Sequence, residues 1–212
     1  MSHIPPPPPY PPPPPLIAPP QPPRAAGPPQ VLVLALAVIG VLIIAGVVLA
    51  ATMLATEESV STDLSEVAVY DDLSNAHEPG DVDYPQTPPV GGPHADTWLD
   101  CGVYAEPVRD ENAVHDLEHG SVWITFDPEL GGEEIDRLAG ALPQNGILSP
   151  YAGLPAPVVV TVWGRQLELT GADDPRLELF IEEYGGGVTA PEPFASCAGG
   201  VRDPDGQIGA EV

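Results

Sequence analysis

Residues 110–126, DENAVHDLEHGSVWITF, decide the fold of this chain, because they join its clearest helix signal to its clearest strand signal. Asp110 is the expected N-cap of a helix over residues 111–119, whose acidic first residues suit the positive end of a helix dipole. Gly120 is expected to end that helix. Residues 121–126 then alternate apolar side chains on one face, which predicts a strand.

The sequence on either side of this segment predicts further elements. Residues 98–104 indicate a short strand, and residues 133–142 have the apolar spacing of an amphipathic helix. A second short strand is expected at residues 147–148, a β-hairpin near the centre of the sheet over residues 157–163 and 166–170, and a third helix over residues 173–184. The fold class predicted is α+β, a small mixed β-sheet with about three helices.

Changes in composition along the sequence predict how the chain is divided into a folded domain, a linker and tails. Residues 90–201 are expected to form the folded domain, followed by a C-terminal tail at residues 202–212. Residues 56–89 contain nine acidic residues, no basic residue and four prolines, a composition typical of an extended acidic linker. Residues 1–30 are dominated by proline and predict a disordered cytoplasmic tail of polyproline II character. Such a tail is either a ligand for an aromatic-lined groove or a solvated low-complexity segment.

Residues 31–55, VLVLALAVIGVLIIAGVVLAATMLA, are expected to be a single transmembrane helix. Twenty-five uncharged residues make a helix of about 37 Å, which exceeds a hydrocarbon core of about 30 Å. Arg24 on one side and acidic residues on the other predict a cytoplasmic N-terminus and an extracytoplasmic C-terminal domain at the cell membrane. The alternative is a cleaved signal peptide, although its apolar region is normally only about 7–15 residues long.

The charge of the presumed outer part narrows the classes of partner. After Thr56 there are five arginines and 31 acidic residues, a net charge of −26 with histidine neutral. Nucleic acids and anionic lipid surfaces bind proteins through lysine and arginine, so both are disfavoured as partners. No phosphate-binding glycine loop is present, and no dinucleotide cofactor is expected.

Cys101 and Cys197 are the two cysteines of the chain. On the oxidising side of a membrane they are expected to form a disulfide that closes a loop of 96 residues. A pair of metal thiolates or a redox pair is the alternative, although neither cysteine belongs to a C-x-x-C motif.

Histidines carry the best candidate for chemistry. In HDLEHG, His115, Glu118 and His119 share one helix face, and two imidazoles one turn apart can hold one metal ion. His94, after a Gly-Gly-Pro turn, is the expected third ligand, whereas Asp116 is assigned to the surface or to a supporting role. The alternative is that the histidines only cap and pack the helix end. His77 is given no role.

His115, Glu118 and His119 also fit H-x-x-E-H, the inverted zinc-peptidase pattern in which glutamate activates water. Three fixed positions are weakly specific, and Gly120 ends the helix where such enzymes continue it. No nucleophile-elbow sequence is present. No catalytic residue is therefore assigned, and the protein is expected to be a binding protein rather than an enzyme.

Several segments, GGPHADTW, DCGVYAEPV, ENAVHDLEHGSVWITFDPEL and PEPFASCAGG among them, resemble the actinobacterial family catalogued as domain of unknown function 3105. The resemblance covers about residues 84–200. It implies a membrane-anchored envelope protein of high-GC bacteria, with the motifs at His94, His115, Glu118, His119 and Gly120. It also implies a Cys101–Cys197 bridge. The family implies no activity, and its usual short N-terminus differs from the long proline tail here.

Three hypotheses follow for the function. The first is a single-pass, membrane-anchored extracytoplasmic domain that binds Cu or Zn through His94, His115 and His119, with Glu118 as fourth ligand or orienting partner. The second is a structural or accessory protein of an envelope complex, without metal. The third is a small metallohydrolase that uses Glu118 as base.

Overall fold

The computed structural model describes residues 34, 38–46 and 63–206. The chain divides into two units, residues 1–58 and residues 59–212. In the first unit, residues 34 and 38–46 are helical, and the rest of the predicted span over 31–55 lies outside the described residues, as does the proline tail over 1–30. Among the helices that the structure describes, none combines the length and the hydropathy that crossing a membrane requires.

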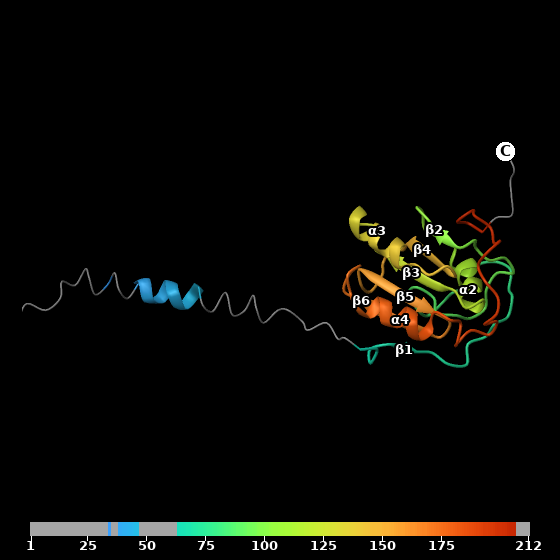
Figure 1. The fold of residues 1–212 in the computed structure, drawn as a ribbon, viewed down its shortest axis with the longest axis horizontal. Coiled ribbons are helices and arrows are strands. Elements are labelled where there is room, and N and C mark those ends of the chain that lie inside the picture. Colours follow the sequence, from blue (N-terminus) through green and yellow to red (C-terminus); the bar gives the residue numbers. More distant parts are fainter. Residues whose placement is uncertain (1–33, 35–37, 47–62, 207–212) are drawn as a thin grey trace, which may run out of the picture. The chain divides into compact units, whose positions relative to one another are not determined.

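The second unit is built on one mixed, six-stranded sheet in the order β1-β6-β5-β3-β4-β2 (Figure 1). Strand β4 pairs in parallel with β2 and β3, and the remaining pairs are antiparallel. The predicted α+β class with a mixed sheet is confirmed, and the predicted hairpin contributes the central strand β5. The strands are β1 (Ala68–Val69), β2 (Gly102–Val103), β3 (Val122–Phe126), β4 (Gly146–Pro150), β5 (Val158–Val162) and β6 (Arg165–Leu169).

Among residues 63–206, three helices accompany this sheet: α2 (Asp110–Glu118), α3 (Gly132–Ala141) and α4 (Arg176–Tyr184). Helix α3 connects β3 to β4, as expected because parallel neighbouring strands need a long crossover. Helix α4 contacts β5 and β6, whereas α2 contacts β3 (Figure 1). Each of the three helices predicted in the folded domain is present, with bounds that differ by a few residues.

The two faces of the sheet carry separate apolar clusters. In β3, Val122, Ile124 and Phe126 belong to the cluster that includes Leu138 of α3 and Phe180 of α4. Trp123 points to the opposite face, because successive strand residues alternate, and joins a cluster with residues of α2. Helix α2 therefore lies on the face opposite to α3 and α4, and everything that it carries is separated from them by the sheet.

The first turn of α2 differs from the prediction. Arg109 is the N-cap residue and makes no side-chain capping bond, whereas Asp110 is the first helical residue. The Asp110 carboxylate instead accepts a hydrogen bond from the Tyr151 hydroxyl at 3.0 Å. Burial raises the pKa of Asp110 to about 6, assisted by the charge of Glu111 and opposed by the bond from Tyr151. The folded state thus favours the protonated form of Asp110.

Asp110→Asn is expected to stabilise the protein by about 1–2 kcal/mol at pH 8. Because the folded pKa lies above the ordinary value of 3.8, the contribution of Asp110 to stability is fully present below about pH 4 and is lost as the pH rises through 6. Asparagine keeps an acceptor for Tyr151 but removes this loss. Urea denaturation of both proteins between pH 4 and pH 8 measures the difference, which should shrink toward pH 4.

Residues 63–89, predicted to belong to the acidic linker, are part of the folded unit. Strand β1 pairs with β6 through Ala68 and Val69, and Leu64 and Val67 pack against the core. These apolar residues are spaced irregularly among acidic ones. The acidic composition of the segment therefore gives no sign that it packs against the core. The folded part of the domain therefore begins before residue 90.

The C-terminal part of the domain is tied to its beginning. Cys101 and Cys197 form the predicted disulfide, which spans 96 residues. Residues 202–206, predicted as the start of a tail, contact the domain: the Arg109 amide donates to the carbonyl of Pro204, and the Arg202 guanidinium pairs with Asp100 at 2.6 Å. The last predicted tail residues, 207–212, lie outside the described residues.

Candidate metal centre

Helix α2 carries polar side chains into the interior of the domain. Every residue from 111 to 118 is buried, because the apolar residues Val114 and Leu117 face Trp123 of the sheet and loops cover the other sides. His115 and Glu118 lie one turn apart on this enclosed helix. Gly120 ends it with a φ of 78°, and an added Cβ there would lie 2.8 Å from the Cα of Gly187. The helix end therefore requires glycine.

A glycine turn places His94 next to α2. Gly91 and Gly92 have φ angles of 137° and 125°, a region that side chains disfavour. A Cβ at Gly91 would also lie 2.8 Å from the Leu73 side chain. The ring of His94, which is fully buried, is therefore held against the helix by a turn that only glycine can make.

His77 reaches the same place from the segment assigned to the linker. It forms an isolated parallel bridge with His94: the Glu78 amide donates to the carbonyl of His94 at 2.8 Å, and the His94 amide donates to the carbonyl of Ala76 at 3.1 Å. The imidazole rings of His77 and His94 lie 4.8 Å apart between centroids, and those of His77 and His115 lie 4.9 Å apart. Three histidines from three segments thus converge.

The carboxylate of Glu118 lies at the centre of this group. Its Oε2 atom is 2.9 Å from the Nε2 of His94, 3.5 Å from that of His77 and 4.0 Å from that of His115. One potential ligand atom from each of the four residues lies within 4.8 Å of the others. A tetrahedral ion with bonds of about 2.0–2.2 Å separates its ligand atoms by about 3.3–3.6 Å. The three distances to Glu118 bracket that spacing.

Backbone carbonyls fix the orientation of two rings. The Nδ1–H of His94 donates to the carbonyl of Gly92 at 2.9 Å, and the Nδ1–H of His115 donates to the carbonyl of Ala95 at 2.7 Å. A carbonyl can only accept, so both Nδ1 atoms carry hydrogen and, in the neutral rings, both Nε2 atoms carry a lone pair. Histidine ligands of metals are held in this way.

Burial also keeps His115 neutral. It lowers the pKa of His115 to about 4, opposed by the hydrogen bond to Ala95 and reinforced by the neighbouring histidines 119, 94 and 77. At neutral pH this ring therefore presents a lone pair rather than a proton. An uncharged imidazole is the form that binds a metal.

His119, predicted as a ligand, lies outside the group of four. Its Nε2 is 3.1 Å from the Nε2 of His115 and 3.6 Å from Oε2 of Glu192. Because the Nε2 of neutral His115 lacks a hydrogen, the Nε2–H of His119 is the donor in this contact. The Trp98 ring packs against both imidazoles, with centroid distances of 5.1 and 5.5 Å. The structure thus assigns His119 to the side of the site that Trp98 covers.

Asp116 is not on the surface and does not belong to the group of four. It is fully buried, and its Oδ2 accepts the backbone N–H of Leu99 at 3.1 Å. Burial raises its pKa well above the usual value, although the bond from Leu99 opposes this. Asp116 therefore holds the loop that carries Trp98 against α2.

His77 and Glu192 are the residues of this region that sequence reasoning missed. His77 lies in an acidic stretch without periodicity, 17 residues before His94, and the weak signal available was the presence of Leu64, Val67 and Leu73 in that stretch. Glu192 lies in a loop next to Pro191 and Pro193. No spacing rule relates either residue to the helix.

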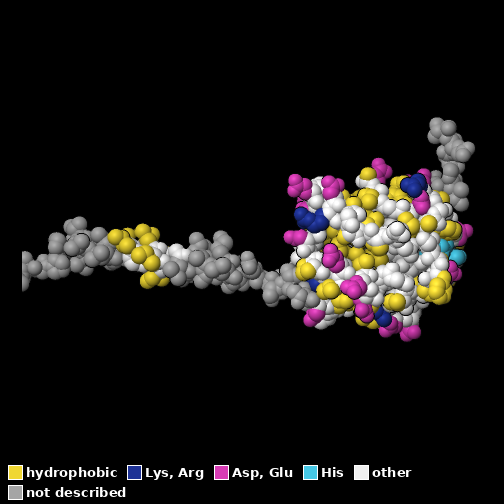
Figure 2. Space-filling view, viewed as in Figure 1, with side chains coloured by type: hydrophobic (Ala, Val, Ile, Leu, Met, Phe, Trp, Pro, Cys, Tyr) yellow, Lys and Arg dark blue, Asp and Glu magenta, His cyan; other side chains and the backbone are white. Residues whose placement is uncertain are grey.

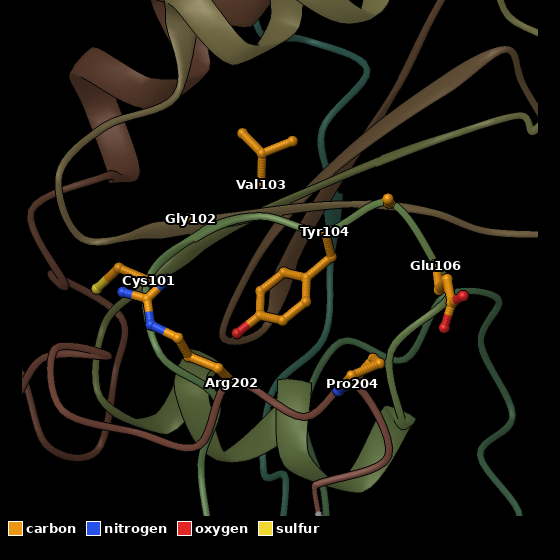
Figure 3. A pocket seen from close by; sticks show the side chains of 8 residues that line it. Cys101, Gly102, Val103, Tyr104, Glu106, Arg202 and Pro204 are labelled. Atoms are coloured by element: carbon orange, nitrogen blue, oxygen red, sulfur yellow. The ribbon is translucent and has the colours of Figure 1, made fainter.

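A separate cavity of about 360 Å³ lies at the edge strand β2. It is lined by residues 101–106 together with Arg202 and Pro204. Figure 3 shows Tyr104 pointing toward the segment of Arg202 and Pro204, while the Val103 side chain points to the other side of the strand. No imidazole lines this cavity, so it is not part of the candidate metal centre.

The arrangement of the four side chains differs from that expected for the H-x-x-E-H peptidase pattern. In that class of peptidase both histidines bind the metal and the glutamate stays free to activate water. Here the Glu118 carboxylate is surrounded by the imidazoles of His77, His94 and His115, and His119 is turned toward Glu192. The arrangement resembles a ligand set of three histidines and one carboxylate rather than a peptidase centre.

The site and the fold define a small α+β domain with a buried histidine and glutamate cluster and a disulfide. Residues 76–199 match the family model described as protein of unknown function (DUF3105). The chain belongs to this family, and the matched residues include His77, His94, His115 and His119. No match was found among curated proteins or among solved structures.

Proposed function

We propose that this protein is a membrane-anchored, extracytoplasmic domain that binds one divalent transition-metal ion through His77, His94, His115 and Glu118. The observation that carries the proposal is that carbonyls hold the Nδ1–H groups of His94 and His115, and that the Nε2 atoms of these rings lie 2.9 and 4.0 Å from Oε2 of Glu118. Among the described residues, the Nε2 of His94 has only the carboxylate of Glu118 as its partner, whereas the Nε2 of His115 accepts from His119, a hydrogen bond that a bound ion would replace.

The contact between His94 and Glu118 needs a positively charged partner. With a hydrogen on Nδ1, neutral His94 presents the lone pair of Nε2 to a carboxylate oxygen 2.9 Å away. Two lone pairs at that distance repel each other unless a proton or a cation lies between them. A proton would relieve the repulsion in this single contact. A metal ion would bind His94, His115, His77 and Glu118 together.

The ligand types favour Zn²⁺ or Cu²⁺. Imidazole suits both ions, and one carboxylate with three neutral imidazoles leaves a complex of charge about +1 in an acidic domain. Cu⁺ prefers thiolate and thioether ligands, but both cysteines are in the disulfide and no methionine follows residue 53. When bound, such an ion would act as a Lewis acid or as a redox centre.

The location proposed is the outer face of an actinobacterial cell membrane. Residues 31–55 contain no charged side chain over a length that can span a bilayer, and Arg24 precedes them. The Cys101–Cys197 disulfide supports an oxidising compartment for the domain. On this proposal, the N-terminus is cytoplasmic and residues 56–62 connect the membrane span to the domain.

The second candidate is a structural or accessory protein of an envelope complex. The observation that favours it is the same 2.9 Å contact, since a protonated His94 would form a buried ion pair with Glu118 without any metal. The pair would then fix the turn at Gly92 against α2. The structural candidate predicts that the purified protein binds no metal, whereas the metal-binding candidate predicts that it does.

The test counts Zn²⁺ and Cu²⁺ bound to the full chain, purified under oxidising conditions. We expect about one ion per chain for the wild type. His94→Ala and His115→Ala are each expected to weaken binding at least about 100-fold, because loss of an outer-shell partner alone costs about 10–100-fold. Circular dichroism melting curves establish that the variants are folded.

His119→Ala is the matched control, since it removes a neighbouring imidazole of the same helix. It is expected to keep the stoichiometry of the wild type. If His119→Ala abolished binding and His77→Ala did not, the ligand set would be that of the sequence prediction. A wild-type chain that binds no metal and melts normally would favour the structural candidate.

A further inference from the structure

The four proposed ligands differ sharply in their access to solvent. The side chains of His94, His115 and Glu118 are 0, 5 and 4% exposed, whereas that of His77 is 49% exposed. Figure 2 shows histidine atoms at the surface of the domain, next to acidic side chains. A hydrated ion that approaches from solvent can therefore meet His77 before it meets the other three.

A cavity of about 290 Å³ leads to His77 from outside. It is lined by His77, Glu78, Pro79, Gly80, Ala95, Asp96 and Arg109. Glu78 and Asp96 are exposed, and the one cationic side chain of the lining, Arg109, is paired with Glu111 at 3.0 Å and with Asp81 at 3.4 Å. The charge of Arg109 is thus compensated, and the cavity presents a negative field that concentrates cations.

The opposite side of the centre is covered. There His119 is 8% exposed, and Trp98 packs on His115 and His119. The segment that carries Glu192 lies over the end of α2, where the Glu192 amide donates to the carbonyl of Glu118 at 3.0 Å. An ion on this side would have to displace packed side chains, whereas the His77 side is already open.

We propose that the metal ion enters and leaves through the His77 cavity, with His77 as its first and last protein ligand. The inference rests on the proposed function and adds that the centre exchanges its ion with solvent or with a chelating partner. The rings of His94 and His115 are held by the carbonyls of Gly92 and Ala95, and Glu118 belongs to helix α2, so these three ligands do not depend on the His77 side chain for their position.

The first experiment measures the association rate of Zn²⁺ with the full chain by stopped-flow competition with a fluorescent chelator. The double variant Glu78→Gln/Asp96→Asn removes two charges from the cavity. Its association rate constant is expected to fall about 3–10-fold at 10 mM salt, and the loss should shrink at 0.5 M salt, where the Debye length is only a few Å.

A matched control removes the same charge elsewhere. Glu182→Gln/Glu183→Gln changes two exposed residues of α4, on the opposite face of the sheet, and is expected to change the rate less than twofold. Glu192→Gln tests entry on the Trp98 side and should also leave the rate unchanged. If Glu192→Gln slowed association and the cavity variant matched the control, the proposed route would be wrong.

The second experiment follows transfer of bound Zn²⁺ to excess EDTA. His77→Ala is expected to raise the dissociation rate at least about tenfold while the three buried ligands still bind the ion. An unchanged dissociation rate would overturn the role of His77 as last ligand. A wild-type chain that binds no ion at equilibrium would instead overturn the proposed function itself, so the two failures are distinguishable.

Discussion

Replacing both cysteines, Cys101→Ser/Cys197→Ser, is expected to lower the free energy of unfolding by about 2–5 kcal/mol. The disulfide closes a loop of 96 residues, and opening it enlarges the unfolded ensemble. It also holds the C-terminal segment, where the Cys197 amide donates to Oδ1 of Asn145 at 2.9 Å. Guanidinium denaturation of the two proteins measures the loss.

The matched comparison is the wild type under reducing conditions, which should unfold at the same denaturant concentration as the double variant. Serine is close in size to cysteine, so the packing of both sites changes little. An unchanged midpoint in the double variant would show that the loop closure contributes nothing to stability. In that case the packing of residues 187–201 alone would have to hold the C-terminal segment.

Arg176→Ala is expected to destabilise the protein by about 3–5 kcal/mol, because it leaves a buried carboxylate without its cation. The side chains of Arg176 and Asp174 are 3% and 0% exposed, and the guanidinium donates to both carboxylate oxygens, at 2.7 and 3.0 Å. Asp174 would keep only the donors of Thr170 and the backbone amide of residue 176. Urea denaturation at pH 7 measures this loss.

The ion pair between Arg176 and Asp174 also makes the stability of the protein depend on pH in the acidic range. Burial would raise the pKa of Asp174, but the hydrogen bonds from Arg176 and Thr170 outweigh it and lower the pKa to about 2. Its contribution to stability is therefore present above about pH 4 and is lost as the pH falls toward 2. Asp174→Asn should remove this part of the acid transition.

Glu66→Gln is the control for Arg176→Ala. Glu66 also pairs with Arg176, but its side chain is 63% exposed, and exposed ion pairs contribute about 0–1 kcal/mol. A loss for Arg176→Ala that did not exceed the loss for Glu66→Gln would contradict the role given to the buried pair.

The regular elements of the domain could be predicted from the sequence because local patterns encode them. The period of apolar residues in α3 and the alternation in β3 are visible within ten residues. Strand β1 was not predicted, since it has two residues and pairs with β6 almost 100 positions later. Its formation depends on the finished sheet edge rather than on its own sequence.

The residues of the candidate centre also fall into two groups, those that the sequence could predict and those that it could not. The spacing of His115 and Glu118 alone places them on one helix face, and Gly91 and Gly92 predict the turn before His94. The exchange of His119 for His77 could not be predicted, because it depends on a parallel bridge between two irregular segments. Helix periodicity brings His119 near His115, but it does not say which other imidazole lies closer to Glu118.

The packing of residues 63–89 has a practical consequence for work on this family. A recombinant fragment that began at residue 90, where the composition changes, would lack strand β1, Leu64 and Val67 from the core, and the imidazole of His77. Such a truncated product would expose the outer edge of β6 and would give a misleading result in any metal titration. Expression should start upstream of residue 63.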